Sequence, residues 1–196
     1  MHKARLEAFS DGVLAIIITI MVLELKVPHG ADFAALKPLL PVFLSYVLSF
    51  VYVGIYWNNH HHLLSSARQI NGSVLWPNLH LLFWLSLVPV ATGWMGENHF
   101  APATLALYGA VLLMAAAAYF ILQNRIIILN GGPSSPLAQA VGRDWKGKLS
   151  PVLYGVGIAS SFVAPWLAEA IYVGVALMWL APDPRIERTL YNAPEA

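Results

Sequence analysis

The sequence predicts an all-α membrane protein with six transmembrane helices in each chain. Composition is the first indication, because 58% of the 196 residues are hydrophobic and only 11% are charged. Soluble globular domains carry about 25% charged residues. In addition, six segments approach the roughly 20 apolar residues that cross a bilayer as a helix, and basic residues concentrate in alternate connections between them. We therefore expect one six-helix transmembrane domain over residues 1–196.

The first four segments are long and the last two are short. The second segment closes on the polar run 56–64, the third includes Pro89, and the fourth carries no charge. Pro165-Trp166 separates the last pair, so a re-entrant hairpin over 149–181 is an alternative to two full crossings. The expected helices lie at about 9–27, 38–58, 75–95, 102–121, 149–164 and 167–181.

The basic residues predict the orientation in the membrane. With the N-terminus in the cytoplasm, nine of the 11 basic residues fall inside and two fall outside, as the positive-inside bias requires. The inner residues are Lys3, Arg5, Arg68, Arg125, Arg143, Lys146, Lys148, Arg185 and Arg188, and the outer ones are Lys26 and Lys37. We expect both termini and the loop 130–148, with an interfacial turn at 136–141, to lie on the cytoplasmic side of the cell (inner, plasma) membrane.

Composition also excludes several classes of function. The formal net charge is +1 and no basic run is interleaved with aromatic residues, so nucleic acid is not expected as a partner. The chain has no cysteine, which excludes disulfides and thiolate metal sites. HExxH and Gly-x-Ser-x-Gly motifs are absent, and the polar tail is too short for a soluble domain. We expect no enzyme activity, no bound metal and no cofactor.

The first helix carries charges that a lipid-facing helix would not tolerate. Only 12 uncharged residues separate Asp11 from Glu24, and they span roughly 18 Å of a hydrocarbon core about 30 Å thick. A charge at the bilayer centre costs at least about 2.5 kcal/mol on a lipid-facing helix. This helix should therefore face protein, a partner subunit or water.

Helical geometry separates the residues of this segment into different faces. A mostly apolar stripe lies within about 80°, with Asp11 more than 90° away and Ser10 on the other side. From spacing alone the stripe could be ordinary packing, and Ser10 and Asp11 could be a local polar cap. The stripe consists of Arg5, Phe9, Gly12, Ile16, Ile20 and Leu23.

The run "YWNNHHHLL" at 56–64 closes the second helix at the same side of the membrane. Consecutive histidines point 100° apart on a helix, so His60 to His62 alone do not predict a metal site. His60 or His61 could instead hydrogen-bond to a neighbouring helix, or simply face water and lipid head groups. Arg5, Asp11, one of these histidines and Asn78 of the third helix can form one polar network between helices or subunits.

These motifs together resemble a known family. Arg5-x-x-x-Phe9-Ser10-Asp11, followed by an isoleucine-rich helix ending in "VLEL", is similar to the signature of the transmembrane protein 175 family of endolysosomal potassium channels and their bacterial homologues. The "YW-x-x-HH" of 56–61, the Asn78 region, Pro89 and Thr92 add to the resemblance. It covers the first half of the chain by motif and the rest by topology.

The resemblance implies a potassium-selective cation channel in which four copies of the chain assemble and the first helix of each lines a central pore. Potassium would be the permeant ion. Ile16 matches the isoleucine constriction of the family, and Thr19, Ile20 and Leu23 match further pore-facing positions. The resemblance also assigns a structural polar network, which comprises Arg5, Ser10, Asp11, His60 or His61, and Asn78.

A pore of this kind would be apolar. The sequence has no T-V-G-Y-G loop and no acidic residue between Ile16 and Leu23, so we expect a hydrated ion to pass an isoleucine ring that closes by dewetting. The alternative is a proton-coupled secondary transporter that uses Asp11, Glu24 and His60 to His62. That class predicts broken helices at corresponding positions of two halves, and Pro89 has no clear counterpart.

Overall fold

The computed structural model describes residues 2–142 and 144–180, and this part of the chain is helical and contains no strand. The prediction of an all-α protein is therefore confirmed for the described residues. Arg143, the tail with Arg185 and Arg188, and the last residue of the predicted sixth helix, Ala181, lie outside them.

Four helical segments are long and apolar enough to cross a membrane. The first is α1 (Lys3–Leu23), the second is η1 (Phe33–Leu39) continued by α2 (Leu40–Ser65), the third is α3 (Gly72–Ser86) continued by α4 (Val88–Glu97), and the fourth is α5 (Pro102–Leu129). These segments occupy the positions of the first four predicted helices, and α2 and α5 extend beyond the predicted ends.

The last two helices are shorter. α7 (Trp145–Ser160) and α8 (Pro165–Leu180) have 16 residues each, which reach about 24 Å against a hydrocarbon core of about 30 Å. Their count as two full crossings therefore stays a prediction. Between α5 and α7 lie the short helices η2 (Gly132–Ser134) and α6 (Pro136–Val141), and α6 occupies the segment expected to form an interfacial turn.

The third segment, expected as one helix, is broken between α3 and α4. Leu87 separates the two helices, and Pro89 is the second residue of α4. Proline has no N–H and its ring clashes with the carbonyl one turn earlier, so the hydrogen-bond ladder cannot run through this point. Both helices nevertheless pack in the bundle, because α3 contacts α1 and α5, and α4 contacts α1, α2 and α5.

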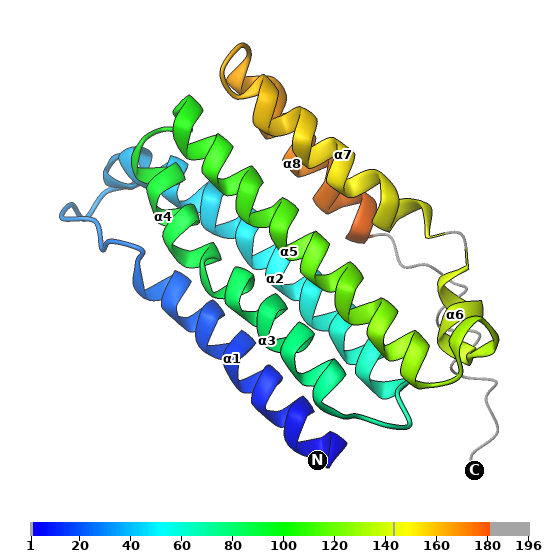
Figure 1. The fold of residues 1–196 in the computed structure, drawn as a ribbon. Coiled ribbons are helices and arrows are strands. Elements are labelled where there is room, and N and C mark those ends of the chain that lie inside the picture. Colours follow the sequence, from blue (N-terminus) through cyan, green and yellow to red (C-terminus); the bar gives the residue numbers. More distant parts are fainter. Residues whose placement is uncertain (1, 143, 181–196) are drawn as a thin grey trace.

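The helices form a bundle with α1 at one edge (Figure 1). α1 packs against α2, α3 and α4, whereas α5 packs between α3 and α7, and α8 contacts α2, α5 and α7. One end of the bundle, here called the amino end, holds the start of α1, the end of α2, the start of α3 and the end of α5. At the opposite end α1 leads into α2, α4 into α5, and α7 into α8 (Figure 1).

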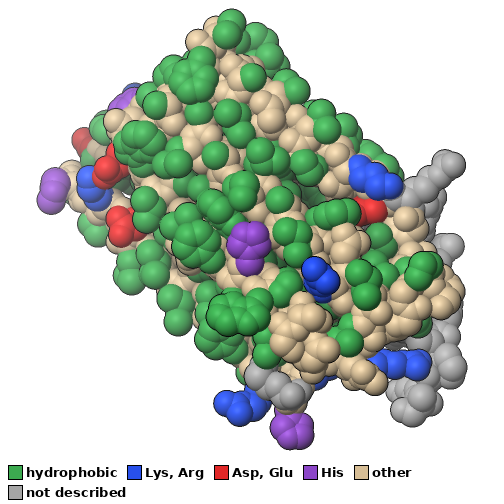
Figure 2. All heavy atoms as spheres, viewed as in Figure 1, with side chains coloured by type: hydrophobic (Ala, Val, Ile, Leu, Met, Phe, Trp, Pro, Cys, Tyr) green, Lys and Arg blue, Asp and Glu red, His purple; other side chains and the backbone are tan. Residues whose placement is uncertain are grey.

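Charged side chains gather at the two ends of the bundle, and the flank between them is largely hydrophobic (Figure 2). This distribution suits a protein whose flank faces lipid and whose ends face water and lipid head groups.

The core between α2, α5, α7 and α8 contains a cluster of tyrosines whose rings meet edge-on or tilted. Tyr172 is fully buried, and its hydroxyl donates to the carbonyl of Leu105 at 3.2 Å. The Tyr52 hydroxyl donates to the carbonyl of Tyr172 at 2.6 Å. Gly109 of α5 and Gly157 of α7 leave the space that the Tyr172 ring occupies, because an added Cβ at either glycine would overlap it.

Candidate functional site

α1 has one face buried against the rest of the chain. The buried residues follow each other at intervals of three and four, the period of a helix with one core-facing side. They are Leu6, Ser10, Leu14, Ile17 and Met21. α1 is therefore fixed in rotation about its own axis by contacts with α2, α3 and α4.

The stripe singled out in the sequence lies on the opposite, exposed side of α1. Ile16 is 58% exposed, Ile20 41% and Leu23 81%. Phe9 is also more than half exposed. The exposed Thr19 donates its hydroxyl to the carbonyl of Ile16 at 2.8 Å, which turns that hydroxyl back onto its own helix. The resulting surface is apolar and unoccupied by any other part of the described chain.

Three buried polar side chains join α1, α2 and α3. The Asn78 amide donates to the Ser10 hydroxyl at 3.0 Å, and the Asn78 carbonyl oxygen lies 2.7 Å from Nε2 of His60. Because that oxygen is an acceptor, Nε2 of His60 carries the proton. Ser10 and Asn78 are fully buried and His60 is 2% exposed. The Ser10–Asn78–His60 chain thus connects three helices in the interior.

The other residues of the predicted network lie outside this chain of hydrogen bonds. Asp11 is exposed and accepts a hydrogen bond from the indole Nε1 of Trp57 at 3.1 Å. The ring of His61 stacks on Trp57 with 6.2 Å between centroids. Arg5 is exposed at the edge of α1. The structure therefore separates a buried chain through His60 from an exposed group of Asp11, Trp57 and His61.

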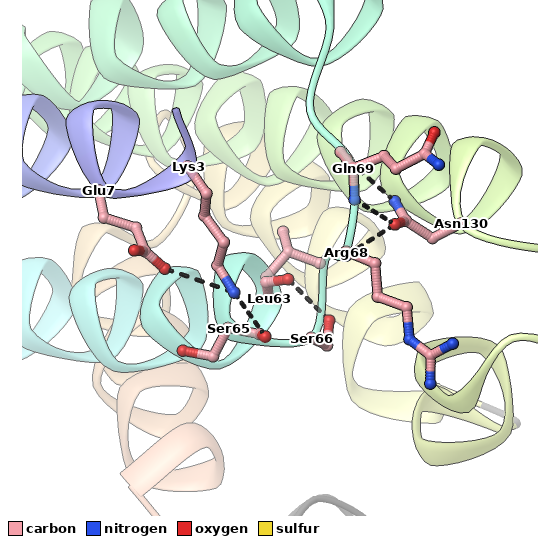
Figure 3. A network of polar contacts seen from close by, with 8 residues as sticks. All are labelled: Lys3, Glu7, Leu63, Ser65, Ser66, Arg68, Gln69 and Asn130. Carbon is pink, nitrogen blue, oxygen red and sulfur yellow. Dashed lines mark hydrogen bonds and ion pairs between the residues drawn. The ribbon is translucent and has the colours of Figure 1, made fainter. Parts of the chain in front are cut away.

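A contact that sequence reasoning missed holds the first turn of α1. The Lys3 ammonium donates to the backbone carbonyl of Ser65 at 2.7 Å and lies 3.9 Å from the Glu7 carboxylate (Figure 3). The spacing of Lys3 and Glu7, four residues apart on a helix, is a visible signal for their pairing. The contact to a carbonyl at the end of α2 has no sequence signal.

Asn130, at the end of α5, is a second residue that sequence reasoning missed. Its side-chain oxygen accepts from the backbone N–H groups of Arg68 and Gln69, both at 2.8 Å (Figure 3). Its amide donates to the carbonyls of Ile126 at 2.9 Å and Gln69 at 3.3 Å. One side chain thus holds the loop between α2 and α3 against α5 at the amino end.

The far end of α1 is tied to α4. After Glu24, which caps α1, the Lys26 ammonium donates to the Glu97 carboxylate at 2.6 Å. The hydrogen bond that Lys26 donates to Glu97, followed by the charge of that carboxylate, raises the pKa of Lys26 above its ordinary value. Within residues 2–142 and 144–180, no cluster of three or more His, Cys, Asp or Glu side chains is placed to hold a metal ion.

Comparison with known proteins places this arrangement among channels. Residues 5–89 match the sequence profile of the family described as "Endosomal/lysosomal potassium channel TMEM175". A protein of Chryseobacterium sp. strain P1-3 named as a potassium channel is 58% identical over 97% of this chain and 98% of its own length. The human protein named "Endosomal/lysosomal proton channel TMEM175" is 35% identical over 46% of this chain, and the match spans 20% of the human sequence.

A solved structure has the same fold. The crystal structure of a "lysosomal potassium-selective channel TMEM175 homolog" from Chamaesiphon minutus superposes with a TM-score of 0.78 at 28% identity. The superposition covers 97% of this chain and 98% of the other. The similarity therefore extends over α7 and α8 as well as over the half of the chain that carries the sequence motifs.

Proposed function

Because the chain belongs to the TMEM175 family of potassium channels, we propose that four copies assemble around a central pore lined by α1 and conduct potassium ions. Members of this family are channels, so the chain is not an enzyme and needs no cofactor. The observation that carries the proposal is the exposed apolar face of α1. α1 itself lies at the edge of the bundle (Figure 1). Cyclic symmetry brings the same edge of each subunit to one axis.

The two faces of α1 suit this role. The buried face and the Ser10–Asn78–His60 chain set its rotation, so a pore made from the other face would have a fixed lining. Asp11, which accepts a hydrogen bond from Trp57, would lie where it can stabilise contacts between pore helices. Arg5, Asp11 and His61 would then support the assembly from the exposed side, where a neighbouring subunit can reach them.

Ile16 is the proposed constriction. It lies beyond the midpoint of α1, and 58% of its surface is exposed. Thr19 donates its hydroxyl to the carbonyl of Ile16, so the pore wall next to the constriction stays apolar. Ile20 and Leu23 continue that wall. An apolar ring passes hydrated ions when it is wide and closes by dewetting when it narrows, which is the gate we propose.

We place both termini in the cytoplasm and the protein in the cell (inner, plasma) membrane. The amino end of the bundle carries Lys3, Arg68 and Arg125, whereas Lys26 and Lys37 lie at the opposite end. This asymmetry follows the positive-inside bias. This proposal includes six crossings of the membrane. The four long segments would make four of them, and α7 and α8 would make the other two.

Flux through liposomes tests the pore. The chain has no cysteine, so Ile16→Cys introduces one reactive thiol. We expect wild-type vesicles to dissipate a potassium gradient, and a charged thiol reagent to block Ile16→Cys by at least about tenfold. Val22→Cys is the matched control, because Val22 is 45% exposed but lies about 120° around the helix from Ile16. Equal block of both variants, or of neither, would refute the pore assignment.

Substitutions of Asp11 test the proposed assembly of four chains. Replacement by alanine removes the acceptor for Trp57 and a charge at the exposed side of α1. We expect Asp11→Ala to lower the recovery of tetramers in detergent more than it lowers the conductance of each channel that forms. Asp11→Asn keeps an acceptor for the indole and should recover more tetramer. Undiminished recovery of Asp11→Ala tetramers would show that Asp11 is not structural.

Proton permeation is a second candidate function, favoured by the animal relatives that are named as proton channels. It would use the same pore, so the thiol block of Ile16→Cys should stop proton and potassium flux together. The proton-coupled transporter based on Asp11 and His60 to His62 is not favoured by a specific contact, because His60 is held by Asn78 in the interior. A transporter would move potassium only with a counter-flux of protons.

A further inference from the structure

A large groove opens at the end of the bundle where α1 ends. Its volume is about 680 Å³, within the 300–1,000 Å³ range of sites that hold small ligands. The groove lies between the α1–α2 connection, the start of α2 and the end of α4. Its lining includes Glu24, Lys26, Leu36, Leu40, Phe43 and Glu97.

The floor of the groove is formed by close packing of α2 and α4. A Cβ added to Gly96 would lie 2.7 Å from the Cα of Val42, a distance that side chains do not adopt. Gly96 therefore allows the two helices to meet behind the groove and leaves the space in front of them open.

One wall of the groove is charged. Lys26 pairs with Glu97 at 2.6 Å, and both side chains are more than half exposed. Glu24 also raises the pKa of Lys26 through its charge, after the larger effects of Glu97. The Glu24 carboxylate therefore interacts with the same ammonium group. Among the described residues Glu24 has no ion-pair partner. Glu24, Lys26 and Glu97 together carry a net charge of −1. A ligand in the groove therefore meets both a positive and a negative group.

The other wall is apolar and leads toward the flank of the bundle. Leu36, Leu40 and Phe43 are 45–50% exposed and follow each other at intervals of four and three. Val47 and Phe50 continue the same exposed stripe along α2. A chain of methylene groups laid on this stripe would start at the charged wall and continue along the exposed apolar side of α2.

We propose that this groove binds one phospholipid with a primary-ammonium headgroup, of the phosphatidylethanolamine class, in each chain. The headgroup ammonium lies beside Glu24, the phosphate beside Lys26, and one acyl chain along Leu36, Leu40 and Phe43. A headgroup with only a negative charge is disfavoured by the net charge of the wall. A trimethylammonium headgroup keeps the positive charge but has no N–H to donate to a carboxylate.

The test varies the headgroup one methyl group at a time. The full chain in detergent is titrated with phosphatidylethanolamine and its mono-, di- and trimethylated forms, and bound lipid is counted by native mass spectrometry. We expect wild type to retain the primary-ammonium lipid at least about tenfold better than the trimethylated one, with the intermediate forms between them. An equal affinity for all four forms would identify an ordinary surrounding lipid and overturn the proposal.

Three variants assign the contacts. Glu24→Gln keeps the size of the side chain and should reduce the headgroup preference to less than about twofold. Leu40→Ser should weaken the binding of all four lipids without changing their order. Glu7→Gln, the same substitution at the amino end, is the control and should bind as wild type does. A preference that survives Glu24→Gln in a variant of native helix content contradicts the proposed site, whatever the channel activity.

Discussion

The amide of Asn78 donates to the hydroxyl of Ser10 at 3.0 Å, in a place where both side chains are fully buried. The same Asn78 accepts from His60 at 2.7 Å. One asparagine of α3 therefore satisfies a residue of α1 and a residue of α2. Its removal leaves two buried polar groups without partners.

We expect Asn78→Ala to destabilise the protein by about 1–3 kcal/mol, because a buried donor or acceptor that loses its partner keeps its full desolvation cost. Thermal unfolding in detergent, followed by circular dichroism, measures the effect. Asn98→Ala is the control, since Asn98 is exposed and donates only to a carbonyl of its own helix. Equal thermal stability of the two variants would show that the buried hydrogen bonds of Asn78 contribute nothing to the stability of the protein.

The contact between Gly109 and Tyr172 predicts a pair of coupled substitutions. A Cβ at Gly109 would overlap the Tyr172 hydroxyl, so Gly109→Ala should cost about 1–3 kcal/mol through overpacking. Tyr172→Phe removes the oxygen and should recover part of that cost in the double variant. Gly155→Ala, where the added methyl group meets nothing within 4 Å, should be neutral or stabilising. Additive losses in the double variant would exclude the overlap.

Asn130 predicts a local change in hydrogen exchange. The amides of Arg68 and Gln69 are held by its side-chain oxygen (Figure 3), so Asn130→Ala should increase their exchange rates by about tenfold or more, the equivalent of about 1.4 kcal/mol. Asn130→Asp keeps an acceptor and should preserve most of the protection. Amides in the middle of α5 serve as the internal reference, and an equal change there would indicate general unfolding instead.

The Lys26–Glu97 pair predicts a dependence of stability on alkaline pH. Because Glu97 raises the pKa of Lys26 above 10.5, the pair contributes fully below that value and loses its contribution as pH rises through the folded-state pKa. The difference in Tm between wild type and Lys26→Gln should be small, because both side chains are exposed. It should be constant well below the ordinary lysine pKa of 10.5 and vanish as the pH rises through the raised folded-state pKa of Lys26. A difference that grows with pH has the wrong sign for this pair.

The positions of the four long segments follow from apolar runs, but their ends do not. The second helix was expected to end at Asn58, whereas α2 continues to Ser65, because Leu63 and Leu64 are buried behind the polar run. α5 likewise continues past Ile121 to Leu129, with Gln123 and Ile126 turned inward. A count of apolar residues underestimates a helix whose last turns leave the bilayer but still pack on one side.

The sequence leaves both His60 and His61 open as partners, and the packing of α2 in the structure puts His60 on the buried side. The buried residues of α2 recur at helical spacing, and Tyr52, Tyr56, His60 and Leu63 fall on that side. His61 points 100° away and stacks on the exposed Trp57. The contacts of Lys3 with Ser65 and of Lys26 with Glu97 could not have been predicted, because they depend on how the chain returns through its loops.

The unequal lengths of the helices have a consequence for the surrounding lipid. α5 has 28 residues and reaches about 42 Å, whereas α7 and α8 have 16 and reach about 24 Å. If α7 and α8 both cross the membrane, a bilayer of normal thickness is thicker than these helices are long, so the lipid beside them would become thinner or would surround their polar ends. In that arrangement, a change in bilayer thickness would act more strongly on the side of the bundle formed by α7 and α8 than on the side formed by α5.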